Sequence, residues 1–479
     1  MQTPHLSEES ASQHLDKVHF IGVGGVGMSG IARVAVEQGM GVSGSDLRES
    51  RYTQQLREAG VNVYIGQDAA HIEAERPDVV VVSTAILDNN PELMEARRRG
   101  IPVWHRAKML AKLGEGKKTV AVAGTHGKTT SSSMAASTLD ALGADPTFLI
   151  GGIVEAYGSN AHSGEGGFYV VEADESDKSF THLDPFAVMV TNVEADHLDH
   201  YQNLDEIHTI FQDFMELVHP DGFIVACGED SELVAAARAT GRTVHTYGLG
   251  ADGGFDTYVE HYRTEGVASF FNVTLPDGTL LACGLEHNPG VHNALNAAGV
   301  LTLLWGLGCD MPAAAKALAK FSGVRRRFEF VGKRRGVTVV DDYAHHPTEI
   351  AATIAAAKAL DFKRVHALFQ PHRYSRIGLF TDVLRDEFAA AFDQADTVTF
   401  MDVYSAGETP VPGVTGETFM EPVRAHRTDA EALHYVPRRL EVVPFLADLA
   451  GDGDLVLTLG AGDVTSIGPE LVAALAEQE

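Results

Sequence analysis

Hydrophobic runs alternate with amphipathic segments along the chain, and the junctions between them are rich in glycine or polar residues. Residues 17–46 have the pattern of a strand, a glycine turn, a helix and a second strand. The same order of strand, turn and helix recurs over residues 119–143 and again over residues 336–360. Because short apolar strands separated by helices form parallel sheets, this pattern predicts an α/β protein.

The length of the chain indicates several domains. A chain of 479 residues is too long for one core, and about 150 residues per domain suggests three. We expect a disordered leader over residues 1–16 and a Rossmann-like domain over 17–116. A central domain with a phosphate loop and a parallel sheet is expected over 117–323, with a small antiparallel excursion at 248–279. A second Rossmann-like α/β domain is expected over 324–479.

Composition excludes some classes of partner. The chain has 37 Lys and Arg against 66 Asp and Glu, a formal charge of −29, which repels nucleic acid and anionic lipid. Its three cysteines form no C-x-x-C pair, as expected of a reduced cytosolic protein. No apolar run reaches the ~18 residues of a membrane span. We therefore expect a cytoplasmic protein without membrane insertion, and the sequence leaves monomer or homodimer open.

The segment TVAVAGTHGKTT predicts a phosphate loop between a buried strand and a helix. Gly124 and Gly127 allow a tight turn whose N–H groups face an anion, Lys128 adds a positive charge, and Thr129 offers a hydroxyl to Mg²⁺. The usual G-x-x-x-x-G-K-[ST] pattern would have its first glycine at Val122. The loop is therefore a shortened variant.

A second glycine motif, G-x-G-x-x-G over residues 22–27, stands at an earlier turn from strand to helix. Asp46 ends the following strand, about 20 residues on, where an acid in a dinucleotide fold contacts a ribose. Ser83 and Thr84 end a later strand, at the edge where α/β sheets bind ligands. By itself the motif predicts a dinucleotide site.

Acidic and basic residues gather at other strand ends. The strands GGFYVV and FAVMV are followed by Glu172 and by His197, which we expect to approach a metal held by Thr129. The segment Arg325–Arg327 is either a surface patch or the source of an arginine that reaches a transferring phosphate. Further basic residues follow two apolar strands and favour an anionic substrate site; these are His345, His346, His372, Arg373 and Arg376.

Taken together, these motifs resemble those of the Mur ligases of peptidoglycan synthesis, over nearly the whole chain. The resemblance rests on GVGGVGMSG, GTHGKTT, EADESD, TNVEADHLDHY, PGVHNALNA, GVRRRFE, DDYAHHPTE, PHRYSR, YSAGE and GAGD. It implies a UDP-sugar-binding first domain, a central ATPase and a third domain that closes over the site. It also reassigns the first glycine motif from NAD to UDP.

The resemblance further implies roles for individual residues. Those implied for ATP are Gly124, Thr125, His126, Gly127, Lys128, Thr129, Thr130, Asn293, Asn296, Arg326 and Asp342. Those implied for the UDP-sugar are Gly24, Gly25, Gly27, Met28, Ser29, Asp46, His71, Ser83, Thr84 and His197. Those implied for the substrate and amino acid are Tyr343, His345, His346, His372, Arg373 and Arg376. The metal ligands implied are Thr129, Glu172 and His197.

The activity implied is an ATP-dependent ligation of L-alanine to the lactyl carboxylate of UDP-N-acetylmuramate. It passes through an acyl phosphate and yields ADP and phosphate, with Mg²⁺, or alternatively Mn²⁺, as the metal. Lys128, Arg373 and Arg376 would be catalytic, with His345 as the first choice of general base. Some Mur ligases carry a carbamylated lysine as a further metal ligand, but the segment YQNLDEIHTIF offers no lysine for that role.

Three alternatives remain at this stage. A recycling ligase of the same family adds a preformed tripeptide to the same sugar nucleotide and shares the DDYAHHPTE motif. A nicotinamide-dependent oxidoreductase would use the first glycine motif but leave the phosphate loop without a role. A non-catalytic module switched by nucleotide would use the loop but give no role to the basic residues of the third domain.

Overall fold

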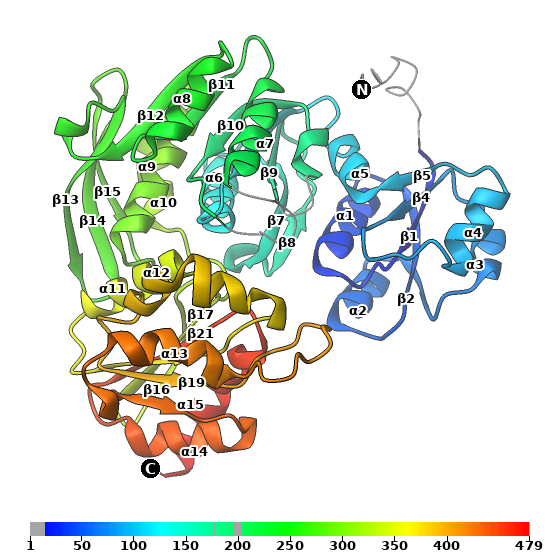
Figure 1. Ribbon diagram of the computed structural model, residues 1–479. Coiled ribbons are helices and arrows are strands. Elements are labelled where there is room, and N and C mark those ends of the chain that lie inside the picture. The colour runs from blue at the N-terminus through cyan, green and yellow to red at the C-terminus, as the bar shows by residue number, and fades with distance from the viewer. Residues whose placement is uncertain (1–14, 176–178, 196–203, 479) are drawn as a thin grey trace.

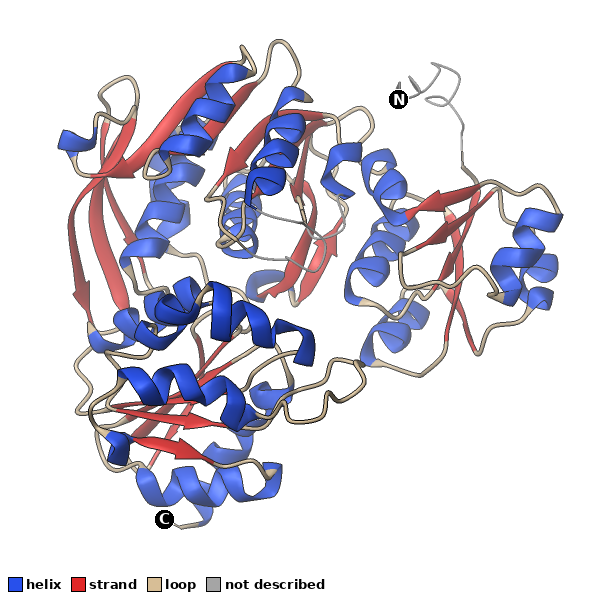
Figure 2. Cartoon of the chain, viewed as in Figure 1, coloured by secondary structure: helices blue, strands red, loops and turns tan. Residues whose placement is uncertain are grey.

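Three α/β bodies, each built around its own sheet, make up the computed structural model of the protein (Figure 1). The structure describes residues 15–175, 179–195 and 204–478. The first body lies to the right in Figure 1, the second at the upper left and the third below it. Helices cover both faces of the sheets, as the blue ribbons around the red strands show (Figure 2). The predicted α/β class is therefore confirmed.

The first sheet is parallel and has the order β3-β2-β1-β4-β5. Its strands are β1 (Lys17–Ile21), β2 (Gly41–Asp46), β3 (Asn62–Ile65), β4 (Val79–Val82) and β5 (Val103–His105). Its helices are α1 (Val26–Glu37), α2 (Arg51–Glu58), α3 (Ala69–Glu75), α4 (Pro91–Arg98) and α5 (Arg106–Lys112). The chain reverses its winding direction between β1 and β4, and ligands of such sheets bind at this point.

The central sheet has ten strands in the order β15-β14-β13-β12-β11-β10-β6-β9-β7-β8. The strands are β6 (Lys118–Ala123), β7 (Thr147–Val154), β8 (Ser159–His162), β9 (Phe168–Glu172), β10 (Pro185–Val190), β11 (Phe223–Cys227), β12 (Thr243–Leu249), β13 (Thr257–Glu265), β14 (Ala268–Thr274) and β15 (Leu280–Leu285). Strand β6 lies between β9 and β10 and is parallel to both. The predicted loop and the two predicted strand ends therefore meet at one sheet edge.

Helices of the central domain flank this sheet. They are α6 (Lys128–Ala141), α7 (Leu204–Glu216), α8 (Ser231–Ala239), α9 (Val291–Gly306) and α10 (Met311–Ala319). The predicted antiparallel excursion is the pairing of β13, β14 and β15, which runs on to Leu285. The hairpin of β7 and β8 has no counterpart among the sequence predictions, because its mixed GGIVEAYGSNAH segment has no clear period.

The third sheet has the order β16-β17-β21-β18-β19-β20, and only its edge strand β16 is antiparallel. The strands are β16 (Glu329–Arg334), β17 (Val337–Asp342), β18 (Val365–Phe369), β19 (Thr397–Phe400), β20 (Leu433–Tyr435) and β21 (Leu455–Leu459). The helices are α11 (Pro347–Lys358), α12 (Arg385–Ala390), α13 (Gly416–His426), α14 (Arg439–Leu449) and α15 (Ile467–Glu477).

The interfaces between the bodies differ in character. One apolar cluster runs through the first and central domains, where α1 packs on the hairpin of β7 and β8. Gly30 of α1 permits this approach, since an added Cβ would lie 3.0 Å from Leu149 Cδ2. The third domain has its own apolar clusters and meets the central domain largely through charged and hydrogen-bonding side chains. Polar interfaces of this kind are the ones that open and close most readily.

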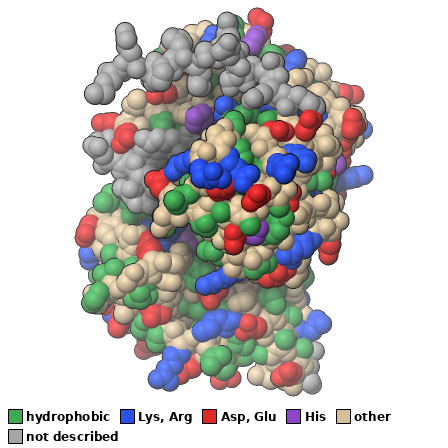
Figure 3. Space-filling model, turned by 90° about the vertical axis from the view of Figure 1, so that its right-hand side faces the viewer, with side chains coloured by type: hydrophobic (Ala, Val, Ile, Leu, Met, Phe, Trp, Pro, Cys, Tyr) green, Lys and Arg blue, Asp and Glu red, His purple; other side chains and the backbone are tan. Residues whose placement is uncertain are grey.

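Surface charge and helix length agree with the composition. The side of the molecule that carries the first domain shows basic and acidic side chains intermixed (Figure 3). Such mixing of charges also occurs at the end of α4, where Arg98 and Arg99 both pair with Glu95. Among the described residues, no helix has both the length and the apolar character needed to cross a bilayer.

Gly124 is the glycine on which the position of the phosphate loop depends, and Gly124→Ala tests it. Its φ is 127°, and an added Cβ would lie 2.1 Å from Thr191 Oγ1. We expect the free energy of unfolding to fall by roughly 2–5 kcal/mol, because the substitution strains the backbone and overpacks the site. A lower urea midpoint of unfolding would show this loss of stability. The control is Gly167→Ala, which meets nothing within 4 Å. Equal midpoints for the two variants would contradict the assigned loop geometry.

Candidate active site

The phosphate loop is held from behind by the end of β10. The Thr191 hydroxyl and the Asn192 side-chain amide both donate to the His126 carbonyl, and the His126 N–H donates to Asn192 Oδ1 at 2.9 Å. Thr125 N–H donates to the Asn192 carbonyl at 3.0 Å. Gly127 adopts a φ of 83° and caps α6, so the helix starts directly at Lys128. The loop is thus fixed in shape without a ligand.

Lys128 is largely buried at the start of α6, with its ammonium group inside the loop. Its Nζ donates to the carbonyls of Gly124 at 2.5 Å and Thr125 at 3.0 Å, and it lies 3.0 Å from Glu175 Oε1. Burial opposes its charge, but Glu175 and the neighbouring acids outweigh burial and raise the pKa of Lys128. Burial also raises the pKa of Glu175 to about 7. An anion that enters the loop would compete with Glu175 for the ammonium group.

Oxygen ligands suited to a hard cation stand beside the loop. The Thr129 hydroxyl donates to Glu172 Oε1 at 2.9 Å, and Glu172 Oε2 accepts from Gly151 N–H at 2.6 Å. An added Cβ at position 151 would lie 2.8 Å from Glu172 Oε1, so a larger residue there would displace this carboxylate. A hydroxyl and a carboxylate next to a phosphate loop are the donors that Mg²⁺ prefers. The third predicted ligand, His197, lies outside the described residues.

A cavity of about 150 Å³ opens next to the loop, between the central and third domains. Its central-domain wall includes the predicted residues Thr130, Asn293 and Asn296, and its third-domain wall includes Asp342. Burial, partly offset by Arg327, raises the pKa of Asp342 to about 6. Residues that were not predicted to bind also line the cavity, namely Tyr247, Asn288, His292, Phe328, Thr348 and Glu349. Of these, only His292 had a signal in the sequence, because it is grouped with Asn293 and Asn296 in the PGVHNALNA motif.

The three consecutive arginines have different partners. Arg325 pairs with Glu155 at 2.9 Å on an exposed surface. Arg326 pairs with Asp341 at 3.0 Å and donates to the Gly460 carbonyl at 2.6 Å. Arg327 lines the cavity and lies 3.5 Å from Glu349 Oε1. The structure therefore brings Arg327 to the cavity, whereas the resemblance pointed to Arg326.

His345 and His346 face different groups although they are adjacent. His345 Nδ1 lies 3.1 Å from the Tyr343 carbonyl and 3.3 Å from Glu349 Oε2. Both are acceptors, so Nδ1 carries a proton. His346 points across to the central domain, where its Nε2 donates to the Ala195 carbonyl at 3.3 Å. Of the two, His345 faces the basic loop that follows β18.

That loop places His372 beside His345, with ring centroids 6.3 Å apart. His372 also stacks on Tyr404, a residue of the YSAGE motif, at a centroid distance of 5.7 Å. Burial, and then the charges of His345, Arg376 and Arg373, lower the pKa of His372 to about 3. His372 is therefore neutral near pH 7. Arg373 has a φ of 67° and donates its N–H to the Tyr404 carbonyl at 2.8 Å, which fixes the start of the loop.

In the first domain, Asp46 braces the glycine loop. The Gly24 N–H donates to Asp46 Oδ2 at 2.9 Å, and an added Cβ on Gly24 would lie 2.8 Å from that oxygen. The remaining predicted residues of this loop are at its turn and at the start of α1: Gly25, Gly27, Met28 and Ser29. Ser83 and Thr84 directly follow β4, the strand next to β1. The predicted groups therefore share one edge of the sheet.

His71 is held at the same edge by a buried carboxylate. Its Nδ1 lies 2.6 Å from Glu92 Oε1, and its ring stacks on Tyr64 with centroids 4.0 Å apart. Glu92 also accepts from the Ser45 hydroxyl at 2.5 Å, and His19 Nε2 is 3.8 Å away. Burial opposes the charge of Glu92, but these hydrogen bonds outweigh burial and lower its pKa. Glu92 had no signal in the sequence, because a single acid on a short helix is usually solvated.

Comparison with known families gives matches along nearly the whole chain. The Mur ligase family, catalytic domain, matches residues 17–118. The Mur ligase middle domain matches residues 122–304. The Mur ligase, glutamate ligase domain, matches residues 326–462.

Individual relatives cover the chain equally well. A UDP-N-acetylmuramate–L-alanine ligase of Acidothermus cellulolyticus is 45% identical over 477 residues, with 97% of this chain and 98% of the relative covered. A ligase of the same name from Carboxydothermus hydrogenoformans is 42% identical, with 95% and 96% covered.

Solved structures agree with these relatives. A crystal structure of a UDP-N-acetylmuramate–alanine ligase from Thermotoga maritima has a TM-score of 0.78 and 28% identity, and the match covers 97% of this chain and 100% of the other. A murein peptide ligase from Psychrobacter arcticus has a TM-score of 0.68 and 24% identity, with 96% and 98% covered, and shares the fold.

Glu92→Gln tests whether the buried carboxylate positions His71 for a ligand. The amide keeps the shape of the side chain but removes the charge that holds the proton on His71 Nδ1. We expect UDP-sugar affinity to fall roughly 10–100-fold, since a hydrogen bond to a charged group contributes about 1.5–3 kcal/mol. ATP affinity should stay unchanged, because its predicted residues are in other domains. Titration calorimetry with each nucleotide measures both.

The matched control for this substitution is Glu95→Gln. Glu95 is on the same helix α4 but pairs with the exposed Arg98 and Arg99. Its substitution should leave both affinities unchanged. Equal UDP-sugar affinities for Glu92→Gln and the unsubstituted protein would show that Glu92 is a structural group only.

Proposed function

The chain belongs to the Mur ligase family, and we propose that it joins L-alanine to the lactyl carboxylate of UDP-N-acetylmuramate, at the expense of ATP, in peptidoglycan precursor synthesis. Relatives that are 42–45% identical over almost their full length carry the name of this activity. The observation that carries the proposal is the cavity in which His126 and Gly127 of the phosphate loop face Arg327 and Glu349 of the third domain. In an oxidoreductase or a non-catalytic nucleotide switch, an arginine of the third domain that faces the phosphate loop would have no role.

The reaction has two steps. The lactyl carboxylate attacks the γ-phosphorus of ATP, and the bond between this phosphorus and the oxygen that bridges it to the β-phosphate breaks. The products of this step are an acyl phosphate and ADP. The amine of L-alanine then attacks the acyl carbon, loses a proton and expels phosphate. Lys128 on one side and Arg327 on the other would stabilise the oxygens of the transferring phosphoryl group. Closure of the third domain would exclude the water that hydrolyses an acyl phosphate.

Mg²⁺ is the proposed cofactor, with Thr129 and Glu172 as its protein ligands and His197 as the third predicted one. The ion would neutralise phosphate charge during transfer. Mn²⁺ could use the same oxygen ligands. The hydrogen bond between Thr129 and Glu172, which brings a hydroxyl and a carboxylate together beside the loop, supports this assignment.

His345 is the proposed general base for the amine. Its Nδ1–H is directed to the Tyr343 carbonyl, so Nε2 can accept the proton of the attacking amine. Arg373 and Arg376 would bind carboxylate groups of the substrates, and the neutral ring of His372 would position them. His346 has a different role in this scheme, because it faces the central domain.

The sugar nucleotide is proposed to bind at the first domain, across the glycine loop, Ser83, Thr84 and His71. The family assignment supports UDP rather than NAD at this loop. We place the reaction in the cytoplasm, where both nucleotides are made. The three cysteines are free thiols, as expected in a reducing compartment.

Lys128→Ala tests the role of the phosphate loop. We expect phosphate release from ATP, Mg²⁺, UDP-N-acetylmuramate and L-alanine to fall at least about 100-fold, because one of the charges that stabilise the transferring group is lost. UDP-N-acetylmuramate should still bind, and the unsubstituted enzyme should form ADP. Near-normal phosphate release by the variant, or AMP as the product, would contradict the mechanism. A panel of amino acids with the unsubstituted enzyme measures how strictly alanine is selected.

Arg327→Ala tests which arginine of the triplet reaches the phosphate. We expect kcat to fall about 1,000-fold, the lower range for an arginine that stabilises phosphoryl transfer. Arg325→Ala removes an equal charge two residues away, but from an exposed pair with Glu155, and should leave kcat unchanged. A similar loss in both variants would point to general electrostatics rather than to contact with the phosphate.

A further inference from the structure

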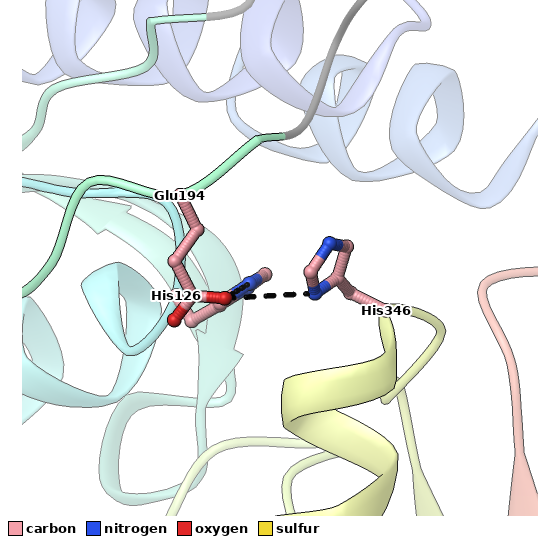
Figure 4. Close-up of side chains that lie close together, drawn as sticks. All are labelled: His126, Glu194 and His346. Carbon is pink, nitrogen blue, oxygen red and sulfur yellow. Dashed lines mark ion pairs between the residues drawn. The ribbon is translucent and has the colours of Figure 1, made fainter. Parts of the chain in front are cut away.

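Three side chains converge where the third domain meets the phosphate loop, and we call His126, Glu194 and His346 the interdomain triad. His126 belongs to the loop, Glu194 follows β10, and His346 precedes α11 (Figure 4). One potential ligand atom from each lies within 4.8 Å of the others. His126 Nε2 is 3.6 Å and His346 Nδ1 is 3.9 Å from Glu194 Oε2.

The outer nitrogen of each imidazole is directed to an acceptor, which leaves the inner nitrogen facing the triad. His126 Nδ1 is 3.3 Å from Glu349 Oε1. His346 Nε2 is 3.3 Å from the Ala195 carbonyl, which can only accept a hydrogen bond. The outer nitrogens therefore carry the protons, and the inner ones can present lone pairs to one point. Metal-binding histidines have this second contact to a carboxylate or a carbonyl almost without exception.

Glu194 is oriented in the same way. The Thr348 hydroxyl donates to its Oε2 at 2.5 Å, from the first turn of α11. Glu194 is partly exposed and His346 is almost fully buried, so the triad has a solvent-facing side and a closed side. A fourth ligand, such as water, has access from the Glu194 side.

We propose that His126 Nε2, Glu194 Oε2 and His346 Nδ1 bind a transition-metal dication, with Zn²⁺ as the expected ion. Two imidazoles and one carboxylate form a common zinc ligand set, with bonds of about 2.0–2.2 Å. Tetrahedral ligands at that bond length lie roughly 3.3 Å apart. The two separations from Glu194 Oε2, 3.6 and 3.9 Å, need to contract by a few tenths of an ångström, and the two imidazole nitrogens lie within 4.8 Å of each other. Mg²⁺ prefers oxygen ligands, so it is expected at Thr129 and Glu172 and not here.

The ion would replace a proton. Burial opposes a charge on His126, but Glu349 and Glu194 outweigh burial and raise the pKa of His126 to about 9. In the metal-free protein the positive charge between the two carboxylates is that of the imidazolium. Binding of Zn²⁺ releases this proton, and the ion then supplies the compensating charge.

The site joins two domains, since two ligands come from the central domain and one from the third. A bound ion would hold the third domain against the phosphate loop through coordinate bonds. Zinc is therefore expected to stabilise the closed arrangement and to slow turnover that requires opening. This inference goes beyond the proposed ligation, and its test needs neither nucleotide nor amino acid.

The test is a titration of the untagged full-length protein with CoCl₂ and then ZnCl₂, without nucleotide and with excess Mg²⁺ to occupy oxygen sites. We expect one equivalent of Co²⁺ to give the strong visible absorption of a low-coordinate site with nitrogen ligands, and Zn²⁺ to abolish it. Zn²⁺ should also raise the midpoint of thermal unfolding. Absorption typical of octahedral oxygen ligation alone would overturn the proposal.

Variants then assign the ligands. His346→Ala and Glu194→Gln should each lose the strong absorption and the zinc-dependent rise in midpoint. Glu349→Gln, which keeps all three ligands and removes the carboxylate charge behind His126, should weaken zinc binding 10–100-fold. The control is His208→Ala, because His208 Nε2 lies 3.3 Å from Glu232 in another histidine–glutamate pair, which has no second histidine ligand among the described residues.

Zinc affinity and stoichiometry that are the same in His346→Ala, Glu194→Gln and His208→Ala would overturn the site. Circular dichroism of each metal-free variant shows whether it is folded. If His346→Ala fails to fold, the near-isosteric Glu194→Gln decides the outcome, because it keeps the packing and removes one ligand.

Discussion

The buried ammonium group of Lys128 is the charge on which the central site depends. It is held by two loop carbonyls and by Glu175, at a place where a sheet strand passes directly into a helix. Three other features hold the loop around this group. They are the positive φ of Gly124 and Gly127, the hydrogen bonds from Thr191 and Asn192, and Glu172 at the end of β9. An unpaired charge at this depth would be costly, so the loop must either keep these partners or exchange them for a phosphate.

The two domain interfaces have different roles in the proposed reaction, because one is apolar and the other is polar. The first and central domains share an apolar core, so the proposed sugar-nucleotide edge and the phosphate loop keep a constant relation. The third domain meets them through ionic and hydrogen-bonded groups, which re-form more easily than packed apolar surface. It brings Arg327 to the cavity, and His345 contacts Glu349 of the cavity wall and lies beside His372. The proposed catalytic groups of this domain would therefore assemble only when the interface is closed.

Charge at that interface is balanced locally although the chain as a whole is acidic. Glu349 is the central group, since it contacts His126, Arg327 and His345 at once. Burial would raise its pKa, but His126 and His345 outweigh burial and hold the pKa well below its usual value. One carboxylate of α11 thus links the phosphate loop, the cavity arginine and the proposed base. The interdomain triad adjoins the same network through His126.

Much of this protein is determined by local sequence. The α/β class and the phosphate loop could be predicted because their signals are local in the sequence. These signals are the short apolar strands, the glycine turns and the order of Gly127, Lys128 and Thr129. The resemblance to Mur ligases supplied the family, which the comparisons confirm. Only the tertiary structure decided which of three equivalent arginines lines the cavity and that His345 and His346 face opposite ways. It also revealed the buried Glu92 beneath His71. The reason is physical: backbone pattern follows from near neighbours, whereas the direction and charge of a side chain depend on groups that are distant in the chain.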